Sequence, residues 1–125
     1  MRFLVVDDSA TMRRILRNNL KALGYEVVEE AENGQAALAK LAAGGVDFVI
    51  ADWAMPVMNG LELVRAIRGD ARQAGLPVLM VTAVDQEAEI IAAIQAQVSG
   101  YIVKPFDPGT LKAKIEQIVS GAGKA

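Results

Sequence analysis

The chain has neither cysteine nor histidine among its 125 residues. Without cysteine it forms no disulfide and offers no thiolate nucleophile, which is typical of proteins in the reducing cytosol. Without histidine it has no imidazole to ligate zinc or haem, to act as a general base, or to carry a phosphoryl group. We therefore expect a cytoplasmic protein whose chemistry uses other side chains.

Excess charge and long apolar runs are also missing. The net charge of −2 gives no basic surface for nucleic acid, and no apolar stretch approaches the roughly 18–20 residues that span a bilayer. The first apolar run, residues 3–6, is followed by two acids and lacks a signal-peptide layout. We expect one soluble domain over residues 1–120 and a flexible tail over residues 121–125, without a nucleic-acid partner or membrane insertion.

Four short apolar runs each stop at a polar residue. Because they are rich in valine, isoleucine and leucine without polar alternation, they predict strands that are covered on both faces. The runs are residues 3–6, 48–51, 78–81 and 101–103, followed by Asp7-Asp8, Asp52, Thr82 and Lys104. Parallel strands end at one edge of a sheet, where open α/β sheets bind ligands. Three carboxylates, a hydroxyl and an ammonium are therefore expected to converge there.

Segments with helical periodicity separate the strands. Their apolar residues predict five helices, and residues 26–29 add a further strand after Gly24. The helical patterns run over residues 12–23, 38–42, 61–67, 90–98 and 111–119. Asn33-Gly34 is interpreted as a helix start rather than a hairpin, and Asp107-Pro108 as an N-cap and first helical residue. The alternation predicts an α/β fold with a five-stranded parallel sheet and helices on both faces.

Each polar residue at the strand ends also has a structural explanation. Asp7-Asp8-Ser9 suits a helix cap and Asp52 a loop, while Thr82 suits a cap and Lys104 a solvated charge. Their coincidence at one edge favours a shared function. Carboxylates within ~5 Å repel by about 3 kcal/mol per pair at an effective dielectric near 20, and a cation such as Mg²⁺ would offset that repulsion. One carboxylate could then attack a phosphoryl group.

Four motifs, in this order, resemble response-regulator receiver domains. They are residues 3–9 (FLVVDDS), 52–60 (DWAMPVMNG), 81–83 (VTA) and 100–106 (GYIVKPF). The resemblance covers about residues 2–119, and residues 11–15 and Trp53 make it greatest to single-domain chemotaxis regulators. It implies the flavodoxin-like strand order 2-1-3-4-5. It also implies a monomer with a histidine kinase as phosphoryl donor, a flagellar motor switch protein as target, and a phosphatase as a further candidate partner.

The resemblance assigns the acidic residues to phosphorylation and metal binding. Asp52 would be the phosphoacceptor of a signalling protein that is not an enzyme but assists its own phosphorylation and dephosphorylation. Asp8 and Asp52 would bind Mg²⁺ directly, together with the backbone carbonyl of Ala54. Asp7 would bind the ion through water.

Further residues are assigned to the phosphoryl group and to signalling. Thr82 and Lys104 would contact the phosphoryl group, as would the backbone at Trp53 and Ala83. Tyr101 would turn inward when Thr82 moves. That movement would change the face formed by the fourth helix, fifth strand and fifth helix, which would bind the target protein.

Three departures from enteric chemotaxis regulators stand out. Ala54 and Val84 occupy positions where those proteins have polar residues, so the dephosphorylation rate and phosphatase recognition are expected to differ. Gln97 replaces a glycine and is expected to alter the end of the fourth helix. The resemblance also implies a cis peptide bond between Lys104 and Pro105.

Other functions fit the sequence less well. A metal-dependent phosphohydrolase would place a second acid at Ser9 and would leave Asp52 and Tyr101 unexplained. A flavin-binding domain needs a phosphate loop where Asp7-Asp8 would repel a phosphate unless a metal intervened. Within the receiver family, a phosphorelay intermediate and a receiver excised from a larger regulator both stay open.

Overall fold

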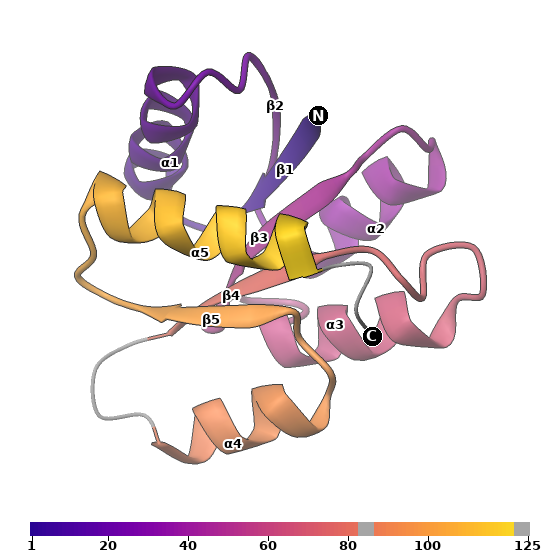
Figure 1. Cartoon of the computed structure of the whole chain (residues 1–125). Coiled ribbons are helices and arrows are strands. Elements are labelled where there is room, and N and C mark those ends of the chain that lie inside the picture. Colours follow the sequence, from indigo (N-terminus) through magenta and orange to yellow (C-terminus); the bar gives the residue numbers. More distant parts are fainter. Residues whose placement is uncertain (83–86, 122–125) are drawn as a thin grey trace.

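The computed structural model describes residues 1–82 and 87–121 of the chain, which form a layered α/β fold (Figure 1). The strands in this part are β1 (Arg2–Val6), β2 (Val27–Ala31), β3 (Phe48–Asp52), β4 (Val78–Thr82) and β5 (Gly100–Val103). All neighbouring pairs are parallel, and the order is β2-β1-β3-β4-β5. The expected sheet and strand order are confirmed.

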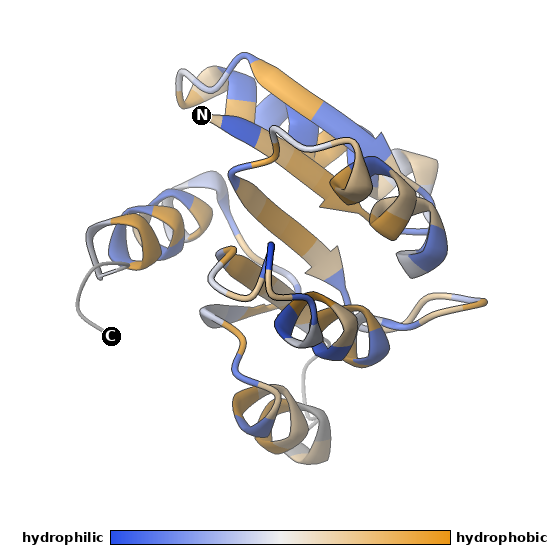
Figure 2. Cartoon of the chain, turned by 90° about the vertical axis from the view of Figure 1, so that its right-hand side faces the viewer, coloured by the Kyte–Doolittle hydropathy of each residue, from blue (hydrophilic) through white to orange (hydrophobic). Residues whose placement is uncertain are grey.

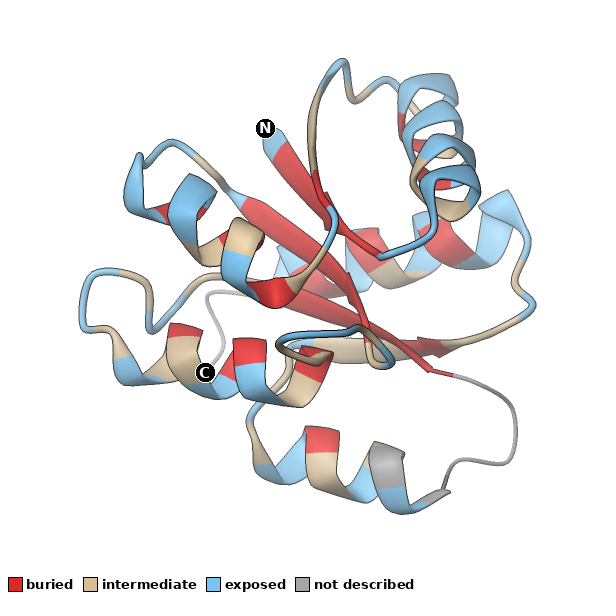
Figure 3. Cartoon of the chain, turned by 180° about the vertical axis from the view of Figure 1, so that it is seen from behind, coloured by how far each residue is buried: buried red, intermediate tan, exposed pale blue. Residues whose placement is uncertain are grey.

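Helices cover both faces of this sheet. The helices are α1 (Ala10–Ala22), α2 (Gly34–Ala42), α3 (Gly60–Gly69), α4 (Glu87–Gln95) and α5 (Pro108–Gly121). α1 and α5 lie on one face, and α2, α3 and α4 lie on the other (Figure 1 and Figure 3). No helix in the described residues is long and apolar enough to cross a membrane.

Two hydrophobic layers hold the helices on the sheet. One joins Phe3 in β1 to Leu16 and Ile115 from α1 and α5, and the other joins Leu4 to Val64 from α3. Each fully buried side chain of this size contributes about 1.5–3 kcal/mol. β3 and β4 are buried along their length, and β1 is buried from its second residue onward (Figure 2 and Figure 3). This confirms that the runs at residues 3–6, 48–51 and 78–81 are covered on both faces. The run at residues 101–103 lies in the edge strand β5, where only Ile102 is buried, so the same expectation is wrong there.

Polar side chains fix the helix starts. The Asn33 side chain accepts a hydrogen bond from Ala36 N at 2.8 Å, which confirms Asn33-Gly34 as a helix start. Asp107 accepts one from Thr110 N at 2.7 Å, so its expected capping role is also confirmed. Such caps satisfy backbone N–H groups that have no partner inside the helix.

Several boundaries differ from the sequence-based expectation. β2 begins one residue later and continues to Ala31, because its parallel register pairs Val27–Ala31 with Arg2–Val6. α4 ends at Gln95, so Val98 lies outside it, and Gln97 adopts a left-handed backbone with φ of 68°. α5 continues through Gly121, which was expected to begin the tail. Residues 122–125 lie outside the described part.

Arg68, near the end of α3, connects three segments. Its guanidinium donates hydrogen bonds to the carbonyl oxygens of Leu76 at 2.7 Å and Gln97 at 2.9 Å. A third bond reaches Ala74 O at 3.0 Å. The residues that follow α4 are thereby tied to α3 and to the segment that leads into β4.

Candidate functional site

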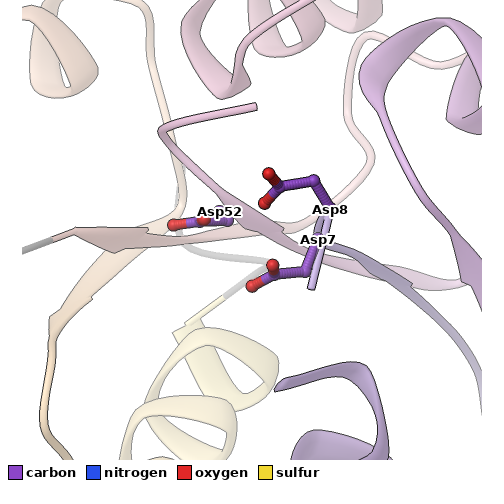
Figure 4. A group of neighbouring side chains, drawn as sticks. All are labelled: Asp7, Asp8 and Asp52. Atoms are coloured by element: carbon purple, nitrogen blue, oxygen red, sulfur yellow. The ribbon is translucent and has the colours of Figure 1, made fainter. Parts of the chain in front are cut away.

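The strand ends bring three carboxylates together. Asp7 and Asp8 follow β1, and Asp52 ends the neighbouring strand β3. Ligand oxygens of all three lie within 4.8 Å of one another, and the side chains point into the same region (Figure 4). We call these residues the acid cluster. The prediction that the acids converge at this edge is confirmed.

The β1–α1 turn is held by several hydrogen bonds. Asp7 N donates to Ala31 O at 3.1 Å, which extends the β1–β2 pairing by one residue. Ser9 N donates to Asp7 Oδ1 at 2.8 Å, while the Ser9 hydroxyl accepts from Met12 N at 3.2 Å. Ser9 therefore caps α1, and its place holds no second acid of the kind that a phosphohydrolase would need.

Burial changes the acid chemistry of this cluster. Asp7 is only 1% exposed, and loss of water raises its pKa to about 6; the Ser9 N–H bond opposes the rise, and the charge of Asp52 adds to it. Burial also raises the pKa of Asp52 above its usual value, although the Lys104 ammonium partly opposes this. Both shifts show that the fold disfavours negative charge here unless a cation compensates for it.

The donor set suits a hard divalent cation. Asp7 Oδ2 is buried and has no hydrogen-bond partner among the described residues, so one carboxylate oxygen is left for a ligand. Beside Asp8, a shallow hollow of about 460 Å³ is lined by Ala54, Asn59 and Trp53 among others, which leaves room for water. Mg²⁺ prefers oxygen ligands and keeps several waters. These residues therefore fit Mg²⁺.

Lys104 and Thr82 complete the edge from the other side. Lys104 Nζ lies 3.2 Å from Asp52 Oδ1, and Lys104 N donates to Thr82 O at 2.8 Å. The Thr82 side chain is fully buried, and its hydroxyl has no hydrogen-bond partner in residues 1–82 and 87–121. The Lys104–Pro105 bond is cis, as predicted. Ala83 and Val84 lie outside the described residues.

The chain is similar in sequence to proteins of one family. Residues 3–116 match the family described as response regulator receiver domain. The chain belongs to this family. It is 52% identical to chemotaxis protein CheY of Pseudomonas aeruginosa over 118 residues, which cover 94% of this chain and 95% of the relative. It is 51% identical to chemotaxis protein CheY1 of Helicobacter pylori over 120 residues, which cover 95% and 97%.

Solved structures agree with this assignment. The structure of chemotaxis response regulator CheY4 of Vibrio cholerae superposes with a TM-score of 0.86 at 35% identity, covering 94% of this chain and 97% of that one. A response regulator from Chloroflexus aurantiacus superposes with a TM-score of 0.91 at 31% identity, covering 95% and 97%. The chain is thus a receiver domain of the CheY type from two-component signalling, a class of signalling proteins rather than classical enzymes.

Tyr101 lies on a different surface of the receiver domain. It is half-buried in β5, and Lys114 Nζ from α5 lies 5.5 Å from its ring centroid, which is within the range of a cation–π contact. Ile91 and Ile94 of α4 are 52% and 58% exposed. α4, β5 and α5 therefore present an aromatic ring, an ammonium group and apolar side chains.

Sequence reasoning missed two supports of the receiver site. Gly60 packs so closely that a Cβ there would lie 2.5 Å from Asp52 O and 2.7 Å from Met80 Sδ. Arg13 of α1 donates to the carbonyl oxygen of Asp7 at 2.6 Å. Gly60 is recognised from the sequence only as part of the motif at residues 52–60, and no local pattern shows that Arg13 reaches back to the acids.

Proposed function

We propose that this receiver domain accepts a phosphoryl group on Asp52 from a histidine kinase. The supporting observation is that the Asp52 carboxylate lies between an ammonium group and the other carboxylates of the acid cluster. One oxygen lies 3.2 Å from Lys104 Nζ, while the same carboxylate belongs to the acid cluster. A nucleophile in this position has positive charge beside the phosphoryl oxygens that it would receive.

The chemistry is a direct transfer between two proteins. An Asp52 carboxylate oxygen forms a bond to phosphorus while the phosphorus–nitrogen bond of a phosphohistidine breaks, and the electron pair goes to the imidazole. A carboxylate nucleophile needs no general base. Lys104 would neutralise one phosphoryl oxygen, and the Thr82 hydroxyl would donate a hydrogen bond to another. By holding these contacts, the domain would assist both its phosphorylation and its dephosphorylation.

Mg²⁺ is the proposed cofactor. Asp8 and Asp52 would bind it directly, with the backbone carbonyl of Ala54, and Asp7 would act through water. When bound, the ion would supply the positive charge that offsets the carboxylates and the incoming phosphoryl oxygens. The orphaned Asp7 oxygen and the water-accessible hollow beside Asp8 support this assignment.

The test is phosphorylation by a small donor. Incubation with acetyl phosphate and Mg²⁺ should give an acid-stable, base-labile adduct on the wild-type chain, and chelation of the metal should prevent it. Asp52→Asn keeps the size of the side chain but removes the nucleophile, so the adduct should fall below detection by intact-protein mass spectrometry. A full-strength adduct on this variant would exclude Asp52 as the acceptor.

The signalling output would be protein binding by the face of α4, β5 and α5. Relatives at 51–52% identity are named as chemotaxis proteins, so the proposed target is a flagellar motor switch protein. Thr82 and Tyr101 would act as the switch, with Thr82 drawn toward the phosphoryl group and the Tyr101 ring turned inward. The phosphoryl group can shift the equilibrium between the resting and switched arrangements of Thr82 and Tyr101 only if it interacts more favourably with one of them.

A further inference from the structure

One cationic side chain contacts the main chain of the acid cluster. Arg13 Nη1 donates a hydrogen bond to Asp7 O at 2.6 Å. This carbonyl belongs to the peptide unit that joins Asp7 to Asp8. Because a peptide unit is planar, a bond to its oxygen restricts how the Cα atoms of both residues are oriented. Arg13 therefore acts on two acids with one contact, without touching either carboxylate.

Glu30 on β2 holds Arg13 in place. Arg13 Nε donates to Glu30 Oε1 at 3.0 Å, and the Arg13 side chain is only 18% exposed. Arg17 Nη1 binds the other oxygen, Glu30 Oε2, at 2.9 Å. The Lys40 ammonium from α2 donates to the Glu30 carbonyl. Glu30 is thus held by three side chains from two helices, α1 and α2, which gives the Arg13 guanidinium a fixed anchor.

The arrangement suits arginine and not other residues. A guanidinium presents several donors in a planar fork, so Arg13 binds the Glu30 carboxylate and the Asp7 carbonyl at once. Lysine carries the same charge on one compact ammonium group and lacks this planar fork of donors. If the only role of Arg13 were to join α1 to β2, its neighbour Arg17 would serve equally well, because both bind the same carboxylate.

We propose that Arg13, anchored by Glu30, is a positioning residue that orients the Asp7–Asp8 peptide and thereby sets the affinity of the acid cluster for Mg²⁺. This inference rests on the proposed function, since it takes the acid cluster as the metal site. The Asp7 N–H bond to Ala31 and the Ser9 N–H bond to Asp7 Oδ1 fix the same turn from other directions. Arg13 supplies the bond to the carbonyl.

The test compares Arg13→Gln with Arg17→Gln. Both variants lose an ion pair with Glu30, but only the first loses the bond to Asp7. Mg²⁺ titration followed by Trp53 fluorescence should give a dissociation constant about tenfold higher for Arg13→Gln, since loss of an outer-shell contact typically weakens metal affinity 10–100-fold. Arg17→Gln should stay within about twofold of wild type. Glu30→Gln should fall between them.

Two further measurements separate an effect of Arg13 on Mg²⁺ binding from effects on folding stability and on the phosphorylation reaction itself. The gain in melting temperature at a fixed Mg²⁺ concentration should shrink for Arg13→Gln but not for Arg17→Gln. Phosphorylation by acetyl phosphate should be slower for Arg13→Gln at limiting Mg²⁺ and equal to wild type at saturating Mg²⁺. Arg13→Lys, which keeps the charge, serves if Arg13→Gln does not fold, and it should still bind Mg²⁺ several-fold more weakly than wild type.

Each outcome decides a different question. If wild type shows no response to Mg²⁺, the proposed metal site fails and the inference fails with it. If wild type responds while folded Arg13 variants keep its affinity, the inference is overturned and the proposed function stands. Equal losses in Arg13→Gln and Arg17→Gln would also overturn it, because they would point to general packing of α1 on β2.

Discussion

The two halves of the site differ in how firmly the chain holds their polar atoms. In the acid cluster, Asp7 has its N–H bonded to Ala31, its carbonyl to Arg13 and one carboxylate oxygen to Ser9, so that of its polar atoms only the second carboxylate oxygen has no partner among the described residues. At the ends of β4 and β5, the buried Thr82 hydroxyl has no partner within the described part of the chain. Among residues 1–82 and 87–121, Lys104 contributes one ion pair, to Asp52.

This difference matches the two tasks proposed for the site. A metal site binds well when its ligands are oriented beforehand, because less ordering is needed on binding. A group that senses an arriving phosphoryl group must instead have an unused hydrogen bond. A buried hydroxyl without a partner costs about 1–3 kcal/mol, and that cost is removed when it bonds. On the proposed function, the acid half would be built before signalling, and the Thr82 half would be completed by it.

The sharpest test of this comparison is to remove one residue from each half and measure Mg²⁺ binding. Asp8→Ala should abolish the Mg²⁺-dependent change in Trp53 fluorescence and the rise in melting temperature, because it removes a proposed ligand. Thr82→Ala should leave the dissociation constant for Mg²⁺ within about twofold of wild type. A normal response in Asp8→Ala, or a lost response in Thr82→Ala, would contradict the division.

A second effect is expected on the coupling between the phosphoryl site and the binding of a partner protein. Beryllofluoride, which mimics a phosphoryl group, should raise the affinity of wild type for a motor-switch peptide about tenfold, within the usual 5–150-fold range of coupling. Thr82→Ala should remove most of this ratio, whereas Thr82→Ser keeps the hydroxyl and should retain it. Equal affinities in all three proteins with and without beryllofluoride would favour a phosphorelay intermediate over a switch.

A different kind of effect is the pH dependence of stability without metal, which concerns the acid cluster alone. Burial raises the pKa of Asp7 to about 6. At a pH between the ordinary pKa of aspartate and this value, Asp7 is therefore protonated in the folded state but ionised in the unfolded state. Stability from this group should therefore fall as pH rises from about 4 to 6, by at most about 1.4 kcal/mol per pH unit, and level off above.

Urea unfolding of wild type and Asp7→Asn, which cannot titrate, isolates this contribution. The difference between their free energies of unfolding should change with pH in that window and nowhere else. With metal present, Mg²⁺ should bind more weakly below about pH 6, because protons compete for Asp7. A difference that is flat from pH 4 to 7 would show that Asp7 titrates normally in the folded protein.

The sequence was most informative where several residues depend on one geometric rule. Apolar runs identified the buried strands, and the shared edge of a parallel sheet then placed Asp7, Asp8, Asp52 and Lys104 together. This reasoning needs no side-chain detail, because strand ends alone carry the residues to the site. The cis bond at Pro105 came from family resemblance and not from any local pattern.

Features that depend on long-range contacts could not be predicted. The Arg13 contact with Asp7 O requires the register of β2, which brings Glu30 alongside α1, and the boundaries of β2 were themselves shifted in the prediction. Val57 has a left-handed backbone with φ of 69°, a conformation that a β-branched residue disfavours. Local preference would therefore predict a different backbone conformation at this position.

The Arg68 contacts have a mechanical consequence for α4. Because Arg68 holds the carbonyl of Gln97, just beyond the C-terminal end of the helix, we expect that end to move least when the helix is displaced. A pull that begins at Thr82 would reach the opposite end of α4. Displacement should then increase from Ile94 toward Ile91 and Ile90, so the end of the helix that follows the site in sequence would carry most of the change to a bound partner.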